Sequence, residues 1–64
     1  MPYLLIMNNE INKFAVENEA GMKVGLIVEL ANGTHVAYTH TDIELYRGKS
    51  FEVALWAIRE GQYL

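Results

Sequence analysis

The stretch Thr41-Asp42-Ile43-Glu44-Leu45-Tyr46-Arg47-Gly48 carries the start and stop signals of one short helix. Thr41 and Glu44 have the spacing of a capping box, in which each side chain binds the other residue's backbone amide. Arg47 places positive charge near the C-terminal end of the helix dipole, and Gly48 stands where a left-handed closing residue is favoured. We therefore predict a helix over residues 41–47, with the rest of the chain arranged around it.

Upstream of this stretch, two apolar runs flank Asn32-Gly33 and predict a β-hairpin over residues 23–40. Asn-Gly favours a two-residue type I′ turn, because both central residues of that turn need positive φ. Such a turn fixes the cross-strand partners. They are Leu30–His35, Val28–Ala37 and Leu26–Thr39 on one face, and Glu29–Val36 and Ile27–Tyr38 on the other. Apolar groups occur on both faces, so the hairpin needs a cover on each side.

The segments before the hairpin are less decisive, and the chain is treated as a single domain over residues 1–64. Residues 1–22 are expected to form an N-terminal extension or arm on a core formed by residues 23–64. The apolar run Tyr3–Met7 fits an edge strand or an arm that docks on a partner. Residues 11–17 fit helical and strand spacing equally, and Glu17–Gly21 predicts a loop.

The tail, residues 51–60, is compatible with either a helix or a strand. Ser50 is a candidate N-cap and Gly61 a candidate terminator for a helix whose apolar stripe would be Phe51, Leu55 and Ile58. The run from Phe51 to Leu55 also alternates in polarity, as in a strand that adds to the sheet. The predicted fold class is α+β: a small antiparallel sheet, made of the hairpin and a further strand, with one short helix.

The composition favours a homodimer. The chain has 64 residues and no cysteine, so no disulfide can stabilise a domain whose size makes it marginal alone. Hydrophobic residues make up 52% of the chain, which is more than a small monomer needs to cover its core. Some of that apolar surface is therefore expected to be shared with a second chain.

Charge and hydropathy exclude several classes of partner. The net charge is −3, from 8 acidic and 5 basic residues, which opposes direct binding to nucleic acid. The apolar run Tyr3–Met7 is too short to span a bilayer, and no basic region precedes it as in a signal peptide. No membrane association is expected, and a cytoplasmic location is the default, with which the absence of cysteine agrees.

No catalytic or metal-binding pattern is present in the sequence. His35 and His40 lie five positions apart, so on a regular strand they point to opposite faces and do not share a metal. Ser50 is the only serine, and no nucleophile elbow surrounds it. We expect neither an enzyme nor a cofactor.

Several residues suit either a core or an interface. Tyr38, Tyr46 and Trp56 fit both roles, since aromatic residues and arginine are favoured at binding hot spots. Tyr46 beside Arg47 on an exposed short helix favours the interface. Glu44 has a simpler interpretation as the capping partner of Thr41.

The hairpin, the predicted helix and the segment that follows resemble a known family over roughly residues 23–60. The matching positions are Asn32-Gly33, His40, Thr41-Asp42, Ile43, Glu44, Gly48, Ser50 and Glu52. This pattern resembles the small phage-encoded inhibitors of uracil-DNA glycosylase, of the type made by podoviruses of Bacillus. The resemblance implies a homodimer rich in antiparallel strand, with one short helix per chain. It also implies a strand after the helix, which favours a strand over Glu52–Ile58.

The resemblance further implies a stoichiometric inhibitor that mimics DNA. The two helices of the dimer would border an apolar groove that captures the side chain inserted by the glycosylase into the DNA minor groove. Carried over by position, Ile43 would line the groove and Glu44 would hydrogen-bond the DNA-binding loop of the enzyme. Tyr46 or Arg47 would complete the groove side, and Tyr38 stands where the family has a glutamate on its second strand.

Two further differences separate the chain from the family. Arg47 stands where a tyrosine is expected directly before the glycine, and Met1–Asn12 precedes the matching region. One alternative is a dimeric interaction module, such as an anti-defence or antitoxin-like protein, that binds another host protein. Another is a small structural protein, in which Tyr3–Met7 and the tail would build a continuous assembly.

Overall fold

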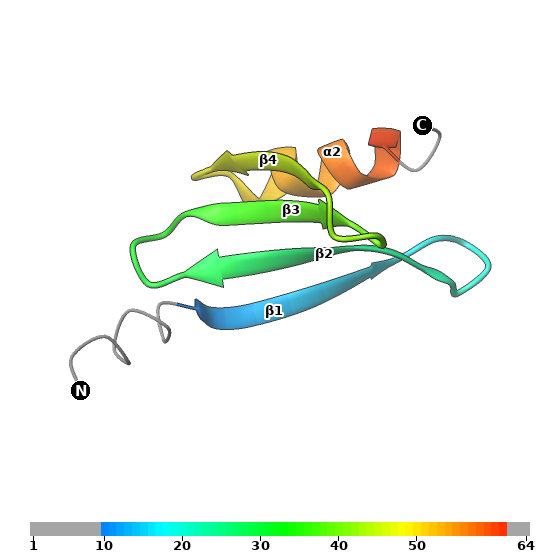
Figure 1. The fold of residues 1–64 in the computed structure, drawn as a ribbon, viewed down its shortest axis with the longest axis horizontal. Coiled ribbons are helices and arrows are strands. Elements are labelled where there is room, and N and C mark those ends of the chain that lie inside the picture. Colours follow the sequence, from blue (N-terminus) through cyan, green and yellow to red (C-terminus); the bar gives the residue numbers. More distant parts are fainter. Residues whose placement is uncertain (1–9, 62–64) are drawn as a thin grey trace.

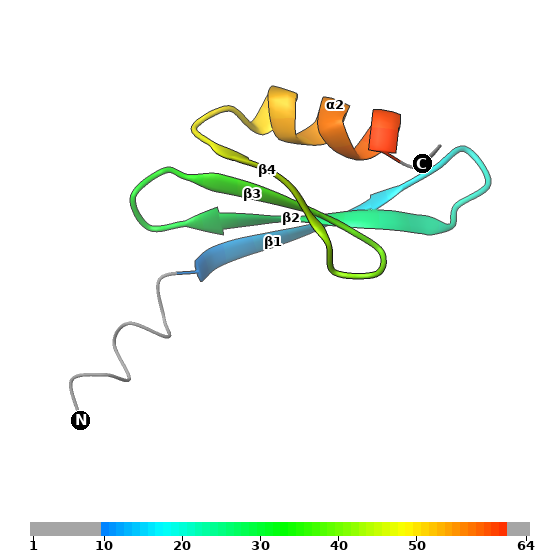
Figure 2. The same ribbon diagram turned by 45° about the horizontal axis from the view of Figure 1, so that its top comes forward.

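The computed structural model describes residues 10–61, which form a four-stranded antiparallel sheet and one C-terminal helix (Figure 1). The strands follow each other in the sheet in chain order. They are β1 Glu10–Glu17, β2 Lys23–Leu30, β3 His35–Thr39 and β4 Glu44–Gly48, and the helix is α2 Phe51–Gly61. The α2 helix covers one face of the sheet, as Figure 2 shows. The α+β class is confirmed.

The β2–β3 hairpin at Asn32-Gly33 is confirmed, but its predicted turn type is wrong. The Leu30 amide donates to the Thr34 carbonyl at 2.8 Å, and the Gly33 amide donates to the Leu30 carbonyl at 3.0 Å. This pattern leaves a three-residue loop in which only Gly33, at φ 89°, is left-handed. A type I turn followed by a left-handed residue produces this closure, whereas a type I′ turn needs two such residues.

The longer loop shifts the predicted register by one residue. Ile27 pairs with Ala37 and Val28 pairs with Val36, whereas the two-residue turn predicted Tyr38 and Ala37 as their partners. A shift of one residue moves each side chain of one strand to the opposite face relative to its partner strand. The observed register places Ile27 and Ala37 together under the helix.

The predicted helix over residues 41–47 is wrong, because this stretch forms the end of the β3–β4 turn and most of β4. The Thr39 amide donates to the Ile43 carbonyl at 2.8 Å, and Asp42 is left-handed at φ 67°. The capping box does not form, since Glu44 binds Arg47 instead of the Thr41 amide. A helix of this length is marginal in water, and pairing with β3 supplies long-range hydrogen bonds that outweigh the local signals.

All three hairpin loops close in the same way. In the β1–β2 loop, Gly21 at φ 82° occupies the left-handed position and its amide donates to the Asn18 carbonyl at 2.9 Å. The Asn18 side chain also accepts bonds from the amides two and four residues later, and Thr39 Oγ1 accepts the equivalent pair in the β3–β4 loop. Asp42 therefore does in the third loop what glycine does in the other two.

The tail is a helix, so the strand that the resemblance favoured over Glu52–Ile58 is wrong. The Val53 amide donates to Ser50 Oγ at 3.1 Å, which confirms Ser50 as the N-cap. The helix ends at Gly61, where the sequence placed the terminator. Its buried residues are Ala54 and Ile58.

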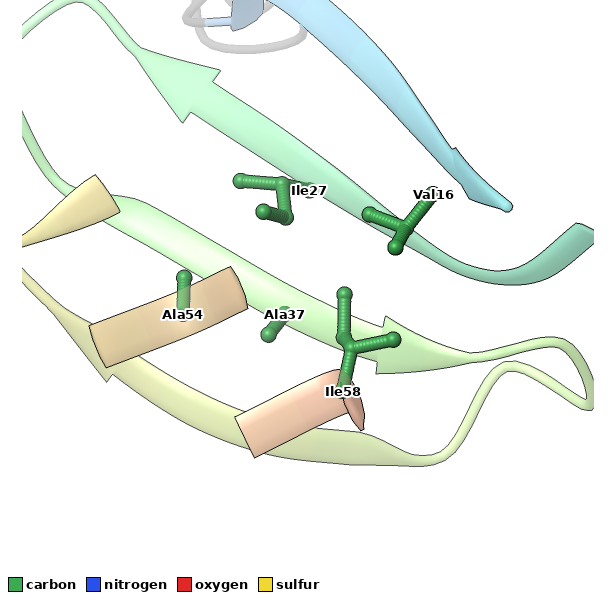
Figure 3. Packing of buried hydrophobic residues seen from close by; sticks show 5 residues of the cluster. All are labelled: Val16, Ile27, Ala37, Ala54 and Ile58. Carbon is green, nitrogen blue, oxygen red and sulfur yellow. The ribbon is translucent and has the colours of Figure 1, made fainter. Parts of the chain in front are cut away.

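The core lies between α2 and the sheet, and Figure 3 shows its buried side chains pointing toward one another. They are Val16, Ile27, Ala37, Ala54 and Ile58. Ile27 and Ala37 are fully buried, and Ile58 is almost so. Burial of a side chain such as isoleucine contributes about 1.5–3 kcal/mol, so these contacts hold the helix against the sheet.

The N-terminal third of the chain is partly integrated into the sheet. Of residues 1–22, which are predicted to form an extension, Glu10–Glu17 form β1 and pair with β2. The predicted arm Tyr3–Met7 lies outside the described residues. Within residues 10–61, no helix is long and apolar enough to cross a membrane.

Candidate interaction surface

Three of the predicted binding residues gather on the sheet face away from α2, which we call the open face. Tyr38 pairs with Glu44 across β3 and β4, and Val36 pairs with Arg47 in the next row. Side chains directly opposite each other share a face, so Tyr38, Glu44 and Arg47 form one patch, and Val36 on the same face is buried. The other open-face residues in the two rows are Lys13, Ala15, Leu26 and Val28.

A β-bulge brings Glu44 and Arg47 together. In a regular strand, residues three apart point to opposite faces, but the register shift between Ala37 and Tyr38 inserts one extra residue, Leu45, into β4. Arg47 Nη2 then donates to Glu44 Oε1 at 3.0 Å, and Arg47 Nε reaches Oε2 at 3.4 Å. The hydrogen bond and the negative charge of Glu44 raise the pKa of the Arg47 guanidinium.

Ile43 lies at the end of the β3–β4 loop, and 61% of its surface is exposed. It borders a hollow of about 290 Å³ between this loop and the end of α2. The lining residues are Val24, Thr39, His40, Thr41, Ile43, Leu45 and Gly61. The lining side chains are aliphatic, hydroxyl-bearing or imidazole groups, and none is a carboxylate, so the hollow suits an apolar side chain with a polar end.

Tyr46 lies apart from the other predicted binding residues. Its ring covers Gly48 and packs against the core beneath the helix. Its hydroxyl accepts a hydrogen bond from the Ser50 amide at 3.3 Å, which ties β4 to the start of α2. These contacts indicate that Tyr46 supports the fold.

The outer side of α2 carries the most exposed aromatic side chain among the described residues. Trp56 is 63% exposed, and Val53, three residues earlier, is also exposed and lies on the same side. From the sequence alone, Trp56 suits either the core or an interface. The signal that decides it is the burial of Ala54 and Ile58, whose spacing turns Trp56 outward.

A larger hollow of about 660 Å³ lies between the β1–β2 loop and the end of α2. It is lined by Glu17, Asn18, Glu19, Ala20, Val24, Arg59 and Glu60. Three carboxylates and one guanidinium, against two apolar side chains, make it a polar, open surface. We therefore take the smaller hollow beside Ile43 as the better binding feature, because burial of apolar area supplies most of the binding free energy.

The histidines do not form a metal site with acidic neighbours, since residues 10–61 contain no group of three or more candidate metal ligands. His35 lies on β3 and its ring meets Phe51 edge-on, with ring centres 5.9 Å apart. Its Nδ1 atom is buried without a hydrogen-bond partner among the described residues. His40 lies in the β3–β4 loop and lines the small hollow.

The fold and this surface define a small α+β protein, a four-strand meander closed by one helix, with exposed apolar residues at the β3–β4 turn and on the helix. Comparisons of the chain with protein-family models, curated proteins and solved structures found no match.

Proposed function

We propose that the chain is a non-catalytic, stoichiometric inhibitor of a bacterial uracil-DNA glycosylase, which acts as a homodimer in the host cytoplasm and does not bind nucleic acid itself. One observation supports a protein-binding role above the others. Ile43 is largely exposed beside a small apolar hollow, and Glu44 and Arg47 follow it in the chain. The choice of enzyme rests on the resemblance at residues 41–52.

The hollow has the dimensions for one side chain. Its volume of about 290 Å³ lies just below the roughly 300–1,000 Å³ found for small-molecule pockets. One apolar side chain buried there contributes about 1.5–3 kcal/mol. The Glu44–Arg47 pair then sets orientation and association rate, since exposed charges at an interface rim contribute more to these than to affinity.

The proposal differs in geometry from the groove implied by the resemblance. Residues 41–47 form a turn and a strand, so they supply no helix to border a groove. The hollow beside Ile43 takes the place of that groove in the proposed mechanism. The captured group is the bulky apolar side chain that the enzyme inserts into DNA, and its capture blocks the DNA-binding face.

The test is a titration of uracil excision by a bacterial uracil-DNA glycosylase. We expect complete inhibition near one dimer per enzyme, and weakened inhibition by Ile43→Asp, which places a charge in the contact. Val53→Asp on the outer side of α2 is the matched control and leaves inhibition unchanged. Full activity of the enzyme in a large excess of the folded protein would rule out this function.

A second candidate is an interaction module for another host protein, and the exposure of Trp56 favours it. Tryptophan is among the residues most enriched at binding hot spots, and Trp56 with Val53 forms an apolar stripe on α2. In this case Val53→Asp abolishes partner binding and Ile43→Asp does not. The same pair of variants therefore separates the two surfaces.

A further inference from the structure

The two edges of the sheet differ in how they are protected. The β4 edge is short and interrupted by the bulge at Leu45, and both features discourage pairing with another strand. The β1 edge is longer and, among the described residues, has β2 as its one strand neighbour. The β1–β2 pairing has two register shifts. Ile11 is an extra residue on β1 and Val24 is an extra residue on β2, so residues 12–17 of β1 form a regular strand.

The exposed side of β1 also carries more apolar surface than a solvated edge needs. Ile11 is 54% exposed and Phe14 is 38% exposed, although the Phe14 ring already meets Phe51 edge-on at a centroid distance of 5.4 Å. An edge strand presents unpaired backbone donors and acceptors, so a strand added there gains hydrogen bonds and covers the exposed part of the Phe14 side chain.

We propose that a second copy of this chain pairs with β1, antiparallel and centred on Ala15, so that two sheets join into one. The segment Lys13-Phe14-Ala15-Val16-Glu17 is complementary to itself when reversed. In this register Lys13 lies opposite Glu17 of the second copy, and Phe14 lies opposite its Val16. Both pairs occur twice because of the twofold axis.

Charge selects this register over those centred nearer the start of β1. Centring the pair on Lys13 places the two lysines opposite each other, and centring it between Lys13 and Phe14 places Glu10 opposite Glu17. Like charges directly opposite on neighbouring strands are destabilising, whereas opposite charges stabilise. Centring it on Phe14 leaves Glu17 opposite Ile11 and forms no ion pair.

The proposed pairing is compatible with the contacts that these residues already make. Lys13 Nζ lies 3.4 Å from Glu10 Oε1 in an exposed pair, and exposed pairs of this kind contribute little, so Lys13 can turn to a new partner. The twofold axis is perpendicular to the sheet, so the α2 helices of both copies lie on the same face. The Ile43 hollow and the β4 edge remain accessible.

The β1 pairing specifies how the homodimer of the proposed function forms, but this pairing needs no glycosylase. The pairing and the glycosylase inhibition can therefore be disproved separately. The experiment is sedimentation equilibrium of the full chain over a wide concentration range. A single strand pair buries less than the roughly 1,200 Å² of a standard interface, so we expect a reversible dimer and not a permanent one. A monomer at every concentration would overturn the proposal.

Charge reversal tests the register. Lys13→Glu and Glu17→Lys each convert two attractive pairs into repulsive pairs, and each is expected to weaken the homodimer by about tenfold or more. An equimolar mixture of the two variants is expected to form a heterodimer, because each chain then meets the opposite charge. Circular dichroism of each variant establishes that it is folded.

Matched controls complete the test. Glu10→Gln removes the existing ion pair of Lys13, and Glu19→Lys reverses a charge in the β1–β2 loop, and neither is expected to change the dimer. The chain has no cysteine, so Ala15→Cys introduces a single thiol at the axis, which should oxidise to a linked dimer much faster than Ala31→Cys. A dimer insensitive to charge at positions 13 and 17, or without recovery on mixing, would reject this interface.

Discussion

Ile58 on α2 lies directly above Gly25 on β2, so close that a Cβ atom added at Gly25 would come within 2.6 Å of Ile58 Cγ2. The same Cβ would lie 2.6 Å from the Tyr38 carbonyl oxygen on β3. Since the carbonyl belongs to the backbone of a central strand, it cannot move without disturbing the sheet. The absence of a side chain at Gly25 sets how closely the helix approaches the sheet.

Gly25→Ala is therefore expected to destabilise the protein by about 1–3 kcal/mol, the cost usually found when extra volume enters a packed core. Urea unfolding followed by circular dichroism measures this change. Lys23→Ala, an exposed substitution on the same strand, is expected to stay within about 0.5 kcal/mol of the parent. An unchanged midpoint for Gly25→Ala would mean that the helix packs farther from the sheet.

Asp42 occupies a left-handed position that glycine holds in the other two loops. Asp42→Gly removes a steric cost of about 1–2 kcal/mol, and the larger conformational entropy that glycine loses on folding partly offsets this gain. The free energy of unfolding is therefore expected to rise by up to about 1 kcal/mol. In a helix over residues 41–47 the same substitution would be destabilising. The sign of the change in a thermal melt thus distinguishes turn from helix.

Ser50 is the N-cap of α2, and its Oγ accepts the Val53 amide. Ser50→Ala is expected to cost about 1 kcal/mol of stability, and Ser50→Asp should retain most of it, since aspartate caps equally well. Thr41→Ala provides the contrast, because Thr41 caps no helix in this fold. A larger loss for Thr41→Ala than for Ser50→Ala in chemical unfolding would contradict this assignment.

Substitutions at Tyr46 and Ile43 are expected to affect different properties, stability at Tyr46 and partner binding at Ile43. Tyr46→Phe removes the acceptor of the Ser50 amide and should cost about 0.5–1.5 kcal/mol while leaving glycosylase inhibition unchanged. Ile43→Ala should change stability by less than about 0.5 kcal/mol, since the side chain is exposed, but weaken inhibition. The two variants are compared by thermal melts and by the excision assay, and the reverse pattern would exchange their roles.

The central hairpin was predictable because its signal is local. Asn32-Gly33 between two β-branched runs marks a reversal whatever the rest of the chain does, and Gly33 does adopt positive φ. The register was not predictable, because two-residue and three-residue loops both accept Asn-Gly and differ by one position. The shift then exchanges which residues face the helix.

The candidate site was only partly predictable for a related reason. The three-residue spacing of Glu44 and Arg47 suits a helix, and the same contact arises in β4 through the bulge at Leu45. Tyr46 fitted an exposed helix face, but on the strand it turns toward the core. The sequence did not decide whether Trp56 is buried or exposed. The helix decides it, because Ala54 and Ile58 define its buried side and Trp56 lies on the other side.

The sequence by itself determined the α+β class, the central hairpin, and the limits at Ser50 and Gly61 that a helix in the tail would have, since these depend on conformational preferences within a few residues. Only the tertiary structure decided that residues 44–48 are a strand and 51–61 a helix. Both segments are amphipathic and short, so their intrinsic preferences differ little in free energy. Residues 44–48 pair with the edge of β3, and residues 51–61 cover the sheet face on which Gly25 makes room for Ile58. These two tertiary contacts selected one arrangement.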